Sequence, residues 1–179
     1  MRRSAPRLVT VLGIAAICLG ATSKSCKLIQ DNIDNREGQF VTALTVQDAG
    51  GQITDVFDRG EQIQVVMTVR NELDTSAVVQ FPSTRQSDFV IVRAGTAEVV
   101  WQWSENQPPF QQIPTELRFA PGETKTFTQT WNQVGRNGVP ARTGTYEARG
   151  VLVFSGFDAD PLQENQLGSP LERFTISDQ

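Results

Sequence analysis

The side chains that could do chemistry in this sequence are two cysteines, 20 carboxylates and three tryptophans, and histidine is absent. Without histidine the chain lacks the commonest general base near neutral pH and the commonest metal ligand. This excludes catalysis through Ser–His and Cys–His pairs. Cys18 and Cys26 are too few for a Cys-rich zinc site or a disulfide framework. We therefore expect a protein that is not an enzyme and that needs neither a metal nor a cofactor.

The carboxylates show no arrangement that is typical of a site. Asp158 and Asp160 lie two residues apart in a predicted loop, but the dense oxygen-ligand spacing of calcium loops is missing. We expect this loop to be solvated. No pair of acids stands out as the two carboxylates of a glycoside hydrolase. The glycines of residues 135–138 are not followed by the lysine and helix of a phosphate-binding loop.

The charges are unevenly distributed along the chain. Of 16 basic and 20 acidic side chains, Arg2, Arg3, Arg7 and Lys24 precede Cys26 and no acid does. From Cys26 onward the balance is therefore 12 minus 20, or −8. Such an acidic body would be repelled by phosphates, so we expect no nucleic-acid partner.

The N-terminus has the layout of a secretory signal. Arginines precede an apolar run over residues 8–21, and the small residues Ala21-Thr22-Ser23 follow. A run of about 14 residues is shorter than the roughly 20 that a membrane-spanning helix needs. We expect residues 1–25 to be a signal peptide or an anchor. The protein would then be exported to the cell envelope or the medium, with membrane contact only through this segment.

Cys26 allows two interpretations. Bacterial lipoproteins are cleaved just before a cysteine that then carries lipid, and Ser25 suits the position before it. Ser23 and Lys24 depart from the usual residues before such a cysteine, so Cys26 is either a lipidation site or a lone thiol. Residues 26–38 are polar and are predicted to be a tether.

Beyond the tether, apolar residues recur at every second position, as in half-buried strands. The apolar set beginning at Ile63 is the clearest example. Strands are expected near residues 40–46, 62–70, 77–81, 88–93, 97–104, 115–119, 125–131, 146–154 and 174–176. No amphipathic helix is apparent, so we predict that residues 39–179 form an all-β, antiparallel, immunoglobulin-like β-sandwich of about eight strands, with a barrel as the alternative. Gly144-Thr145-Tyr146 at a strand start is typical of a tyrosine corner, whose hydroxyl bonds nearby backbone.

Three tryptophans and a polar group leave alternatives open. Trp101 and Trp103 alternate and are expected to face the same way, either into the core or outward as a ligand platform. The same choice applies to Trp131. Arg85, Gln86 and Asp88 form either a surface network or a hydrogen-bonded cluster at the mouth of a strand, and the structural interpretation is favoured.

Several of these residues occur in an order that resembles the BsuPI-type intracellular proteinase inhibitor family. The resemblance spans about residues 60–152 and includes Phe81-Pro82-Ser83, the run 85–90 with Arg85 in place of the usual glycine, the run 100–104, Phe110, Pro121-Gly122-Glu123, and Gly144-Thr145-Tyr146. It implies an immunoglobulin-like sandwich and inhibition of a serine proteinase. The family motif reads as core and turn residues: Phe81, Pro82, Gln86, Asp88, Phe89, Trp101, Trp103, Ser104, Gly122, Trp131 and Tyr146.

Two functions remain open after this comparison. A proteinase inhibitor would need a rigid exposed loop, and residues 104–114 are the candidate because three prolines lower the cost of ordering it. The candidate partner-binding residues are Ser104, Glu105, Asn106, Gln107, Pro108, Pro109 and Phe110. The alternative is an envelope-associated binding or assembly module with no proteinase target. Either way the expected partner is a protein.

Overall fold

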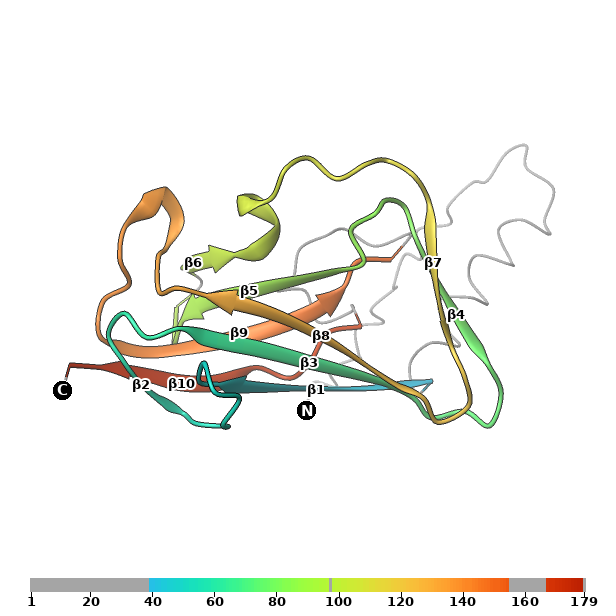
Figure 1. Ribbon diagram of the computed structural model, residues 1–179, viewed down its shortest axis with the longest axis horizontal. Helices are drawn as coiled ribbons and strands as arrows, with labels where there is room; N and C mark the ends of the chain where they lie inside the picture. The colour runs from blue at the N-terminus through green and yellow to red at the C-terminus, as the bar shows by residue number, and fades with distance from the viewer. Residues whose placement is uncertain (1–38, 97, 155–166, 179) are drawn as a thin grey trace, which may run out of the picture. The chain divides into compact units, whose positions relative to one another are not determined.

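The computed structural model describes residues 39–96, 98–154 and 167–178 (Figure 1). This part of the chain contains ten strands: β1 (Phe40–Gln47), β2 (Val56–Asp58), β3 (Ile63–Asn71), β4 (Ala77–Phe81), β5 (Ser87–Arg93), β6 (Val99–Gln102), β7 (Thr115–Phe119), β8 (Thr124–Trp131), β9 (Gly144–Leu152) and β10 (Glu172–Ser177). Two short 3-10 turns, η1 (Trp103–Asn106) and η2 (Arg136–Gly138), complete the set. The fold is all-β, as predicted.

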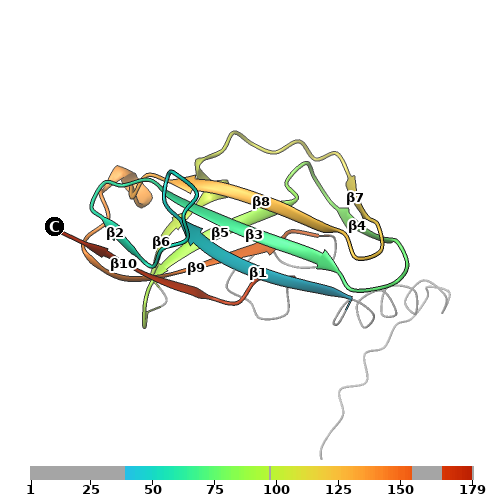
Figure 2. The same ribbon diagram turned by 60° about the horizontal axis from the view of Figure 1, so that its bottom comes forward.

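The strands form two facing sheets. One has the order β1-β3-β8, and Figure 2 shows these strands side by side in one layer. The other has the order β2-β10-β9-β5-β6. Every pairing is antiparallel except β2 with β10. This arrangement is the immunoglobulin-like β-sandwich predicted from the alternation of apolar residues.

A third sheet contains only the strands β4 and β7, and it closes one end of the sandwich. These strands continue from the far ends of β3 and β8 and rise across the edge (Figure 1). Asn71 stabilises the corner from a fully buried position: its side-chain amide donates to the carbonyls of Thr75 (2.8 Å) and Ala120 (3.0 Å). The paired strands β4 and β7 border the loop of residues 103–114, which joins β6 to β7.

The core lies between the two sheets and is lined by the alternate apolar residues of the facing strands. Val65, Met67, Phe89 and Ile91 are completely buried. The packing is tight at Gly150 of β9, where a Cβ atom would lie 2.9 Å from the Met67 sulfur and 3.0 Å from the Phe89 ring. No side chain fits there, so glycine is required by packing.

Tyr146 forms the predicted tyrosine corner. Its hydroxyl donates to the carbonyl of Arg142, four residues upstream, and its ring is buried. The strands expected near residues 88–93 and 97–104 pair as the antiparallel hairpin of β5 and β6, with Ile91 opposite Trp101. Strand β2 was not predicted, because only Phe57 of its three residues is buried and three residues give no readable alternation.

The expectation that residues 97–104 form one strand is wrong at its end. Strand β6 stops at Gln102, and Trp103 begins the 3-10 turn η1. Trp101 is buried, whereas Trp103 is only half-buried and packs against the edge of the core. The two indoles therefore do not share a strand face, because the alternation ends between them.

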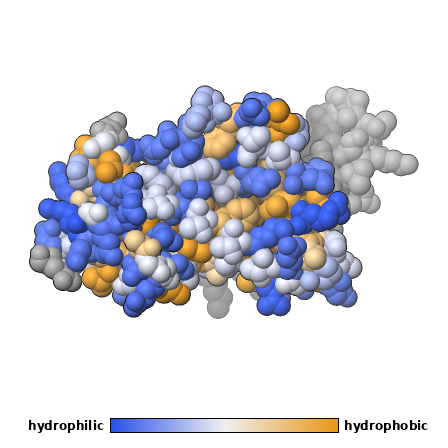
Figure 3. Space-filling model, in the orientation of Figure 1, coloured by the Kyte–Doolittle hydropathy of each residue, from blue (hydrophilic) through white to orange (hydrophobic). Residues whose placement is uncertain are grey.

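The surface of the described residues mixes polar and apolar side chains, as the face in Figure 3 shows. The large exposed apolar residues are Val41, Ile53, Val56, Leu73, Ile113, Val134, Val139 and Leu171. Across residues 39–96, 98–154 and 167–178, no helix has the length and apolar character needed to cross a membrane. The predicted signal segment, the tether and Cys26 lie outside the described residues.

Candidate functional site

The loop that joins β6 to β7 is the candidate partner-binding segment. It begins with η1 and arches over the end of β5 before it enters β7 (Figure 1). Its exposed residues are Glu105, Asn106, Gln107, Pro108, Pro109, Gln111, Gln112, Ile113 and Pro114. Ser104 and Phe110 are half-buried. Residues 105–114 are therefore exposed except at Phe110, and these exposed residues form the outer edge of the loop.

Asp88 fixes the start of this loop. The carboxylate is completely buried in β5, and it accepts hydrogen bonds from the backbone N–H of Ser104 (3.1 Å) and the Ser104 hydroxyl (2.7 Å). The side-chain amide of Gln102 donates a third bond, at 2.7 Å. A buried carboxylate is stable only when its oxygens are satisfied in this way. The bonds therefore fix the chain at the point where β6 ends and η1 begins.

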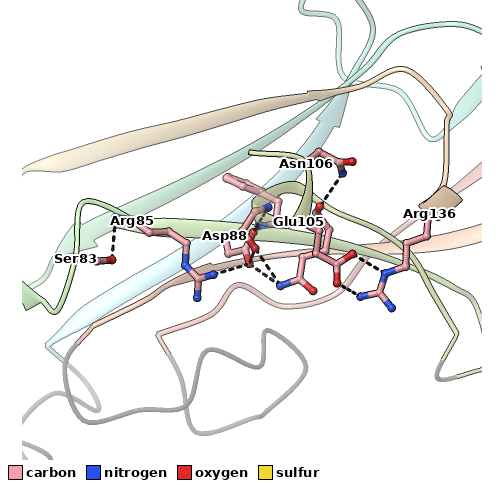
Figure 4. Close-up of polar contacts among 9 residues, drawn as sticks. Ser83, Arg85, Asp88, Glu105, Asn106 and Arg136 are labelled. Atoms are coloured by element: carbon pink, nitrogen blue, oxygen red, sulfur yellow. Dashed lines mark hydrogen bonds and ion pairs between the residues drawn. The ribbon is translucent and has the colours of Figure 1, made fainter. Parts of the chain in front are cut away.

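Arg85 closes the same cluster from the other side (Figure 4). Its guanidinium lies 3.9 Å from the Asp88 carboxylate and 5.8 Å from the centre of the Phe110 ring. A cation over an aromatic face is attracted to it. The backbone at Arg85 has no positive φ angle, so the glycine that the family usually has here is not required. Of the polar group of Arg85, Gln86 and Asp88, the structure brings Arg85 and Asp88 together as an ion pair, whereas the Gln86 amide donates to the Thr115 hydroxyl.

The middle and the end of the loop are held by residues 83–86. Thr84 and Gln111 exchange two bonds: the Thr84 N–H donates to the Gln111 carbonyl (3.0 Å), and the Gln111 N–H donates to the Thr84 hydroxyl (3.2 Å). The Thr115 hydroxyl donates to the Ser83 carbonyl at 3.0 Å. Between these points Phe110 packs on Trp103, with ring centroids 5.6 Å apart. The loop is therefore attached along its length.

Arg136 attaches the loop from a second direction. It makes a two-pronged contact with the Glu105 carboxylate, in which Nε donates to Oε2 at 2.7 Å and Nη2 donates to Oε1 (Figure 4). Paired N–H groups match a carboxylate in geometry as well as charge. The contact links η1 to η2 across 31 residues of sequence. No local pattern in the sequence relates residue 136 to Glu105, so this contact could not be predicted.

A cleft of about 470 Å³ lies beside the loop. Trp101, Trp103 and Trp131 line it together with uncharged amide and hydroxyl side chains, including Asn106 and Gln107. Trp101 and Trp131 are nevertheless core residues, and their rings lie 6.4 Å apart inside the sandwich. Of the three tryptophans, Trp103 alone exposes a substantial part of its ring. The structure thus favours the core interpretation over a platform of stacked indoles.

The residues of the family motif divide between the core and the attachment of the loop. Phe81, Phe89, Trp101, Trp131 and Tyr146 are buried in the core. A second group supports the loop or turns the chain: Asp88 accepts hydrogen bonds from Ser104, Gln86 donates to the Thr115 hydroxyl at 3.4 Å, Trp103 packs on Phe110, Pro82 is exposed after β4, and Gly122 has a φ of 67° in the turn before β8.

The described residues contain no group of three acidic side chains that could hold a metal ion. Asp158 and Asp160 lie outside the described residues. Charge at the site comes from Asp88, Arg85, Glu105 and Arg136, which pair with one another. With these charges paired, the exposed residues of the loop other than Glu105 are uncharged, which suits contact with another polypeptide.

Solved structures with a similar arrangement of strands share little sequence with this chain. A β-glucosidase from Erythrobacter marinus is 11% identical with a TM-score of 0.43, over 77% of this chain and 15% of that one. A CARDB domain from Pyrococcus furiosus is 14% identical with a TM-score of 0.40, over 78% and 96%. A sporulation control protein from Bacillus subtilis is 12% identical with a TM-score of 0.43, over 77% and 50%. The chain thus matches only a small part of the β-glucosidase. No curated protein matches the sequence.

A family model described as intracellular proteinase inhibitor matches residues 53–156. The match covers more than half of the chain and includes β2 to β9 with the entire loop. It also includes both groups of motif residues, in the core and at the loop attachment. Membership implies a non-catalytic role and a protein partner. The chain belongs to the BsuPI family of intracellular proteinase inhibitors.

Proposed function

We propose that this protein is an exported, non-catalytic inhibitor of a proteinase, that the target is a serine proteinase, and that residues 104–114 form the contact segment. One observation carries the proposal: an exposed stretch of the chain is fixed at its start by Asp88, in its middle by Thr84 and at its end by Ser83. The family described as intracellular proteinase inhibitor supplies the class of partner.

The attachment of the loop suits inhibition because an inhibitor should not have to order its contact segment on binding. Immobilising a flexible side chain costs about 0.5–1.5 kcal/mol. Pro108, Pro109 and Pro114 fix backbone angles in the free protein, and the Asp88 cluster fixes the position of Ser104. The contact segment therefore loses most of its conformational freedom when the protein folds, and little remains to be lost on binding.

The chemistry of the outer edge suits a polypeptide partner. Its one charged residue, Glu105, is already paired with Arg136. The rest are amides, prolines and Ile113, whose side chain is 56% exposed. Amides can hydrogen-bond to the backbone of another chain, and an exposed isoleucine adds apolar area at the centre of a contact.

Export is supported by the sequence of the N-terminal segment. Positive residues flanking an apolar run stay on the cytoplasmic side, so the domain would be translocated. The target would then be a proteinase of the envelope or the medium. If Cys26 carries lipid, several acyl chains would hold the domain at a membrane, because one chain anchors only marginally.

The contact segment is tested by comparing two matched variants in an inhibition assay. Ile113→Asp places a charge on the loop, and Ile53→Asp places the same charge on a side chain that is 64% exposed elsewhere. The full chain is titrated against a subtilisin-type serine proteinase, and residual peptide hydrolysis gives the inhibition constant. We expect Ile113→Asp to weaken inhibition at least tenfold, because it buries an unpaired charge in the contact. We expect Ile53→Asp to inhibit like the unaltered protein.

Equal inhibition by both variants would contradict the assignment of the contact segment. Failure of the unaltered chain to inhibit serine proteinases would contradict the proposed activity. Capture of an envelope protein that depends on Ile113, together with no inhibition, would support the alternative of a binding or assembly module.

Export and lipidation are tested with one pair of fusions. Residues 1–40 are joined to a reporter that is active only outside the cytoplasm, with cysteine or serine at position 26. Reporter activity supports export, and its absence would contradict it. Activity that is membrane-bound with cysteine and soluble with serine would establish lipidation of Cys26.

A further inference from the structure

A second cleft, separate from the contact segment, has an unusual charge. It has a volume of about 530 Å³ and lies between the β5–β6 hairpin and residues 135–142. Arg93, Arg136 and Arg142 line it, opposed by the single carboxylate of Glu98. After Cys26 the sequence has only 12 basic residues against 20 acidic ones. Three of those 12 basic residues line this one cleft, so its charge is opposite to that of the body.

The three arginines differ in how far they are neutralised. Arg136 is paired with Glu105. Among the described residues, neither Arg93 nor Arg142 forms an ion pair. Glu98 likewise forms none there, although it lines the same cleft. Two positive charges are therefore available on the wall.

Arg93 is held in place by the tyrosine corner. Its guanidinium donates to the Tyr146 hydroxyl (3.3 Å) and to the Thr143 carbonyl (3.4 Å), and it lies 5.6 Å from the centre of the Tyr146 ring. Gly144 leaves room for it, because a Cβ there would lie 2.9 Å from Nη2. A guanidinium has five N–H donors, so this one keeps donors for a ligand while its position is fixed.

We infer that this cleft binds a carboxylate on an acidic segment of a protein partner, an inference that rests on the proposed function for the class of partner. Guanidinium groups bind carboxylates and phosphates through paired hydrogen bonds. A carboxylate is favoured because the acidic body repels polyanions, whereas it tolerates one or two charges delivered to a basic cleft. The linkage of η2 to η1 through Arg136 and Glu105 places this cleft next to the start of the contact segment.

The test measures peptide binding directly, without a proteinase. The full chain, labelled with ¹⁵N, is titrated with the blocked peptide acetyl-Ala-Glu-Glu-Ala-amide and with its Gln-Gln counterpart. We expect the acidic peptide alone to shift the amide signals of Val99, Val100 and Gly135, which line the cleft. Added salt should weaken the binding, because these charges are partly exposed to solvent.

Two variants and a matched control assign the effect to the cleft. Arg142→Gln removes an exposed guanidinium but keeps the backbone carbonyl that accepts the Tyr146 hydroxyl. We expect it to raise the dissociation constant about threefold to tenfold, the range of one exposed or partly desolvated charge contact. Glu98→Gln should lower the constant about twofold to threefold, because it removes a repelling carboxylate. Arg70→Gln, on β3 of the other sheet, should change nothing.

Three results would overturn the inference: equal shifts with both peptides, no difference between Arg142→Gln and Arg70→Gln, or shifts with inorganic phosphate but none with the acidic peptide. The peptide titration contains no proteinase, so its result can be interpreted even if the protein fails to inhibit in the inhibition assay. Conversely, loss of peptide binding leaves the assignment of residues 104–114 standing.

Discussion

Two regions of the same sandwich are held together by different physics. In one region Trp131, Tyr146 and Phe174 pack as a buried aromatic cluster, with ring centroids 5.8–6.3 Å apart. In the other region a single buried carboxylate, Asp88, holds the loop of residues 103–114 through hydrogen bonds. The aromatic region depends on area and shape, whereas the loop region depends on a few directed bonds.

Because of this difference, the stability of the fold and the conformation of the loop depend on different residues. Burial of large apolar side chains is non-directional and contributes most of the stability of a domain. Hydrogen bonds to one carboxylate add less free energy but specify one conformation. Substitutions in the two regions should therefore affect stability and loop order in different proportions.

The largest effect is expected from Trp131→Ala. The indole is 1% exposed and contacts three rings of the facing sheet, and its N–H donates to the Val134 carbonyl at 2.8 Å. Removing it should lower the free energy of unfolding by about 3–5 kcal/mol, as for other large aromatics in cores. Urea denaturation measures this loss. A cost below that of Trp103→Ala would contradict the central place of Trp131.

Asp88→Ala should lower stability less but change the loop more. It leaves the Ser104 N–H, the Ser104 hydroxyl and the Gln102 amide without their acceptor, which should cost about 1–3 kcal/mol. Amide exchange at residues 104–107 should accelerate, while exchange in β3 stays slow relative to global unfolding. Asp88→Asn is the matched control, since it keeps one acceptor oxygen. Unchanged exchange in the loop would refute the anchoring role of the carboxylate.

Trp103→Ala should cost less than Trp131→Ala. The indole is half-buried at the edge of the core and packs on Phe110. We expect a loss of about 1–3 kcal/mol, because less apolar area leaves water there. The loop should loosen at Phe110, which loses its ring partner. A loss equal to that of Trp131→Ala in urea denaturation would mean that Trp103 is as much a core residue as Trp131.

The smallest effect is expected at Glu123, in the turn between β7 and β8. The Lys125 ammonium donates to its carboxylate at 2.7 Å and the Ala120 N–H also donates to it, so the pKa of Glu123 is lowered from its ordinary value. A lowered folded-state pKa stabilises the protein above the unfolded pKa, and this is lost as the pH falls through the folded value. Glu123→Gln should therefore lower the melting temperature slightly at pH 7.

That difference between Glu123→Gln and the unaltered protein should shrink as the pH falls from the ordinary pKa of a glutamate through the lowered pKa of folded Glu123, where the carboxyl of the unaltered protein becomes protonated. Thermal melts between pH 3 and pH 7 measure it, with Glu116→Gln on β7 as the control. A difference that persists at low pH would mean that the ion pair with Lys125 is not its cause.

The elements that sequence predicted well are those defined by local pattern. Alternation located β3 and β8 because every second residue faces the core. Gly144 and Tyr146 at the start of β9 predicted the tyrosine corner, since that bond joins residues only four apart. The proximity of Arg85 to Asp88 could be predicted because the two residues are only three apart, whereas the bonds of Asp88 to Gln102 and Ser104 could not.

The rest depends on contacts between distant parts of the chain. The end of β6 at Gln102 is set by the bond from Ser104 to Asp88, which competes with continuation of the strand. The pair Arg136–Glu105 joins residues that no periodicity relates. The basic cleft likewise takes Arg93 and Arg142 from different strands and loops, so it became visible only once the sheets were assembled.

The most direct test of the central claim is hydrogen exchange in a complex. The full chain is mixed with a subtilisin-type serine proteinase whose catalytic serine is replaced by alanine, and exchange is compared with that of the free chain. Protection is predicted at the amides of residues 105–107 and 110–113, since Pro108, Pro109 and Pro114 have none. Strands β1 and β3 should exchange as before. Protection confined to β1 and β3, with residues 105–113 unchanged, would contradict the assignment of the loop as the contact segment.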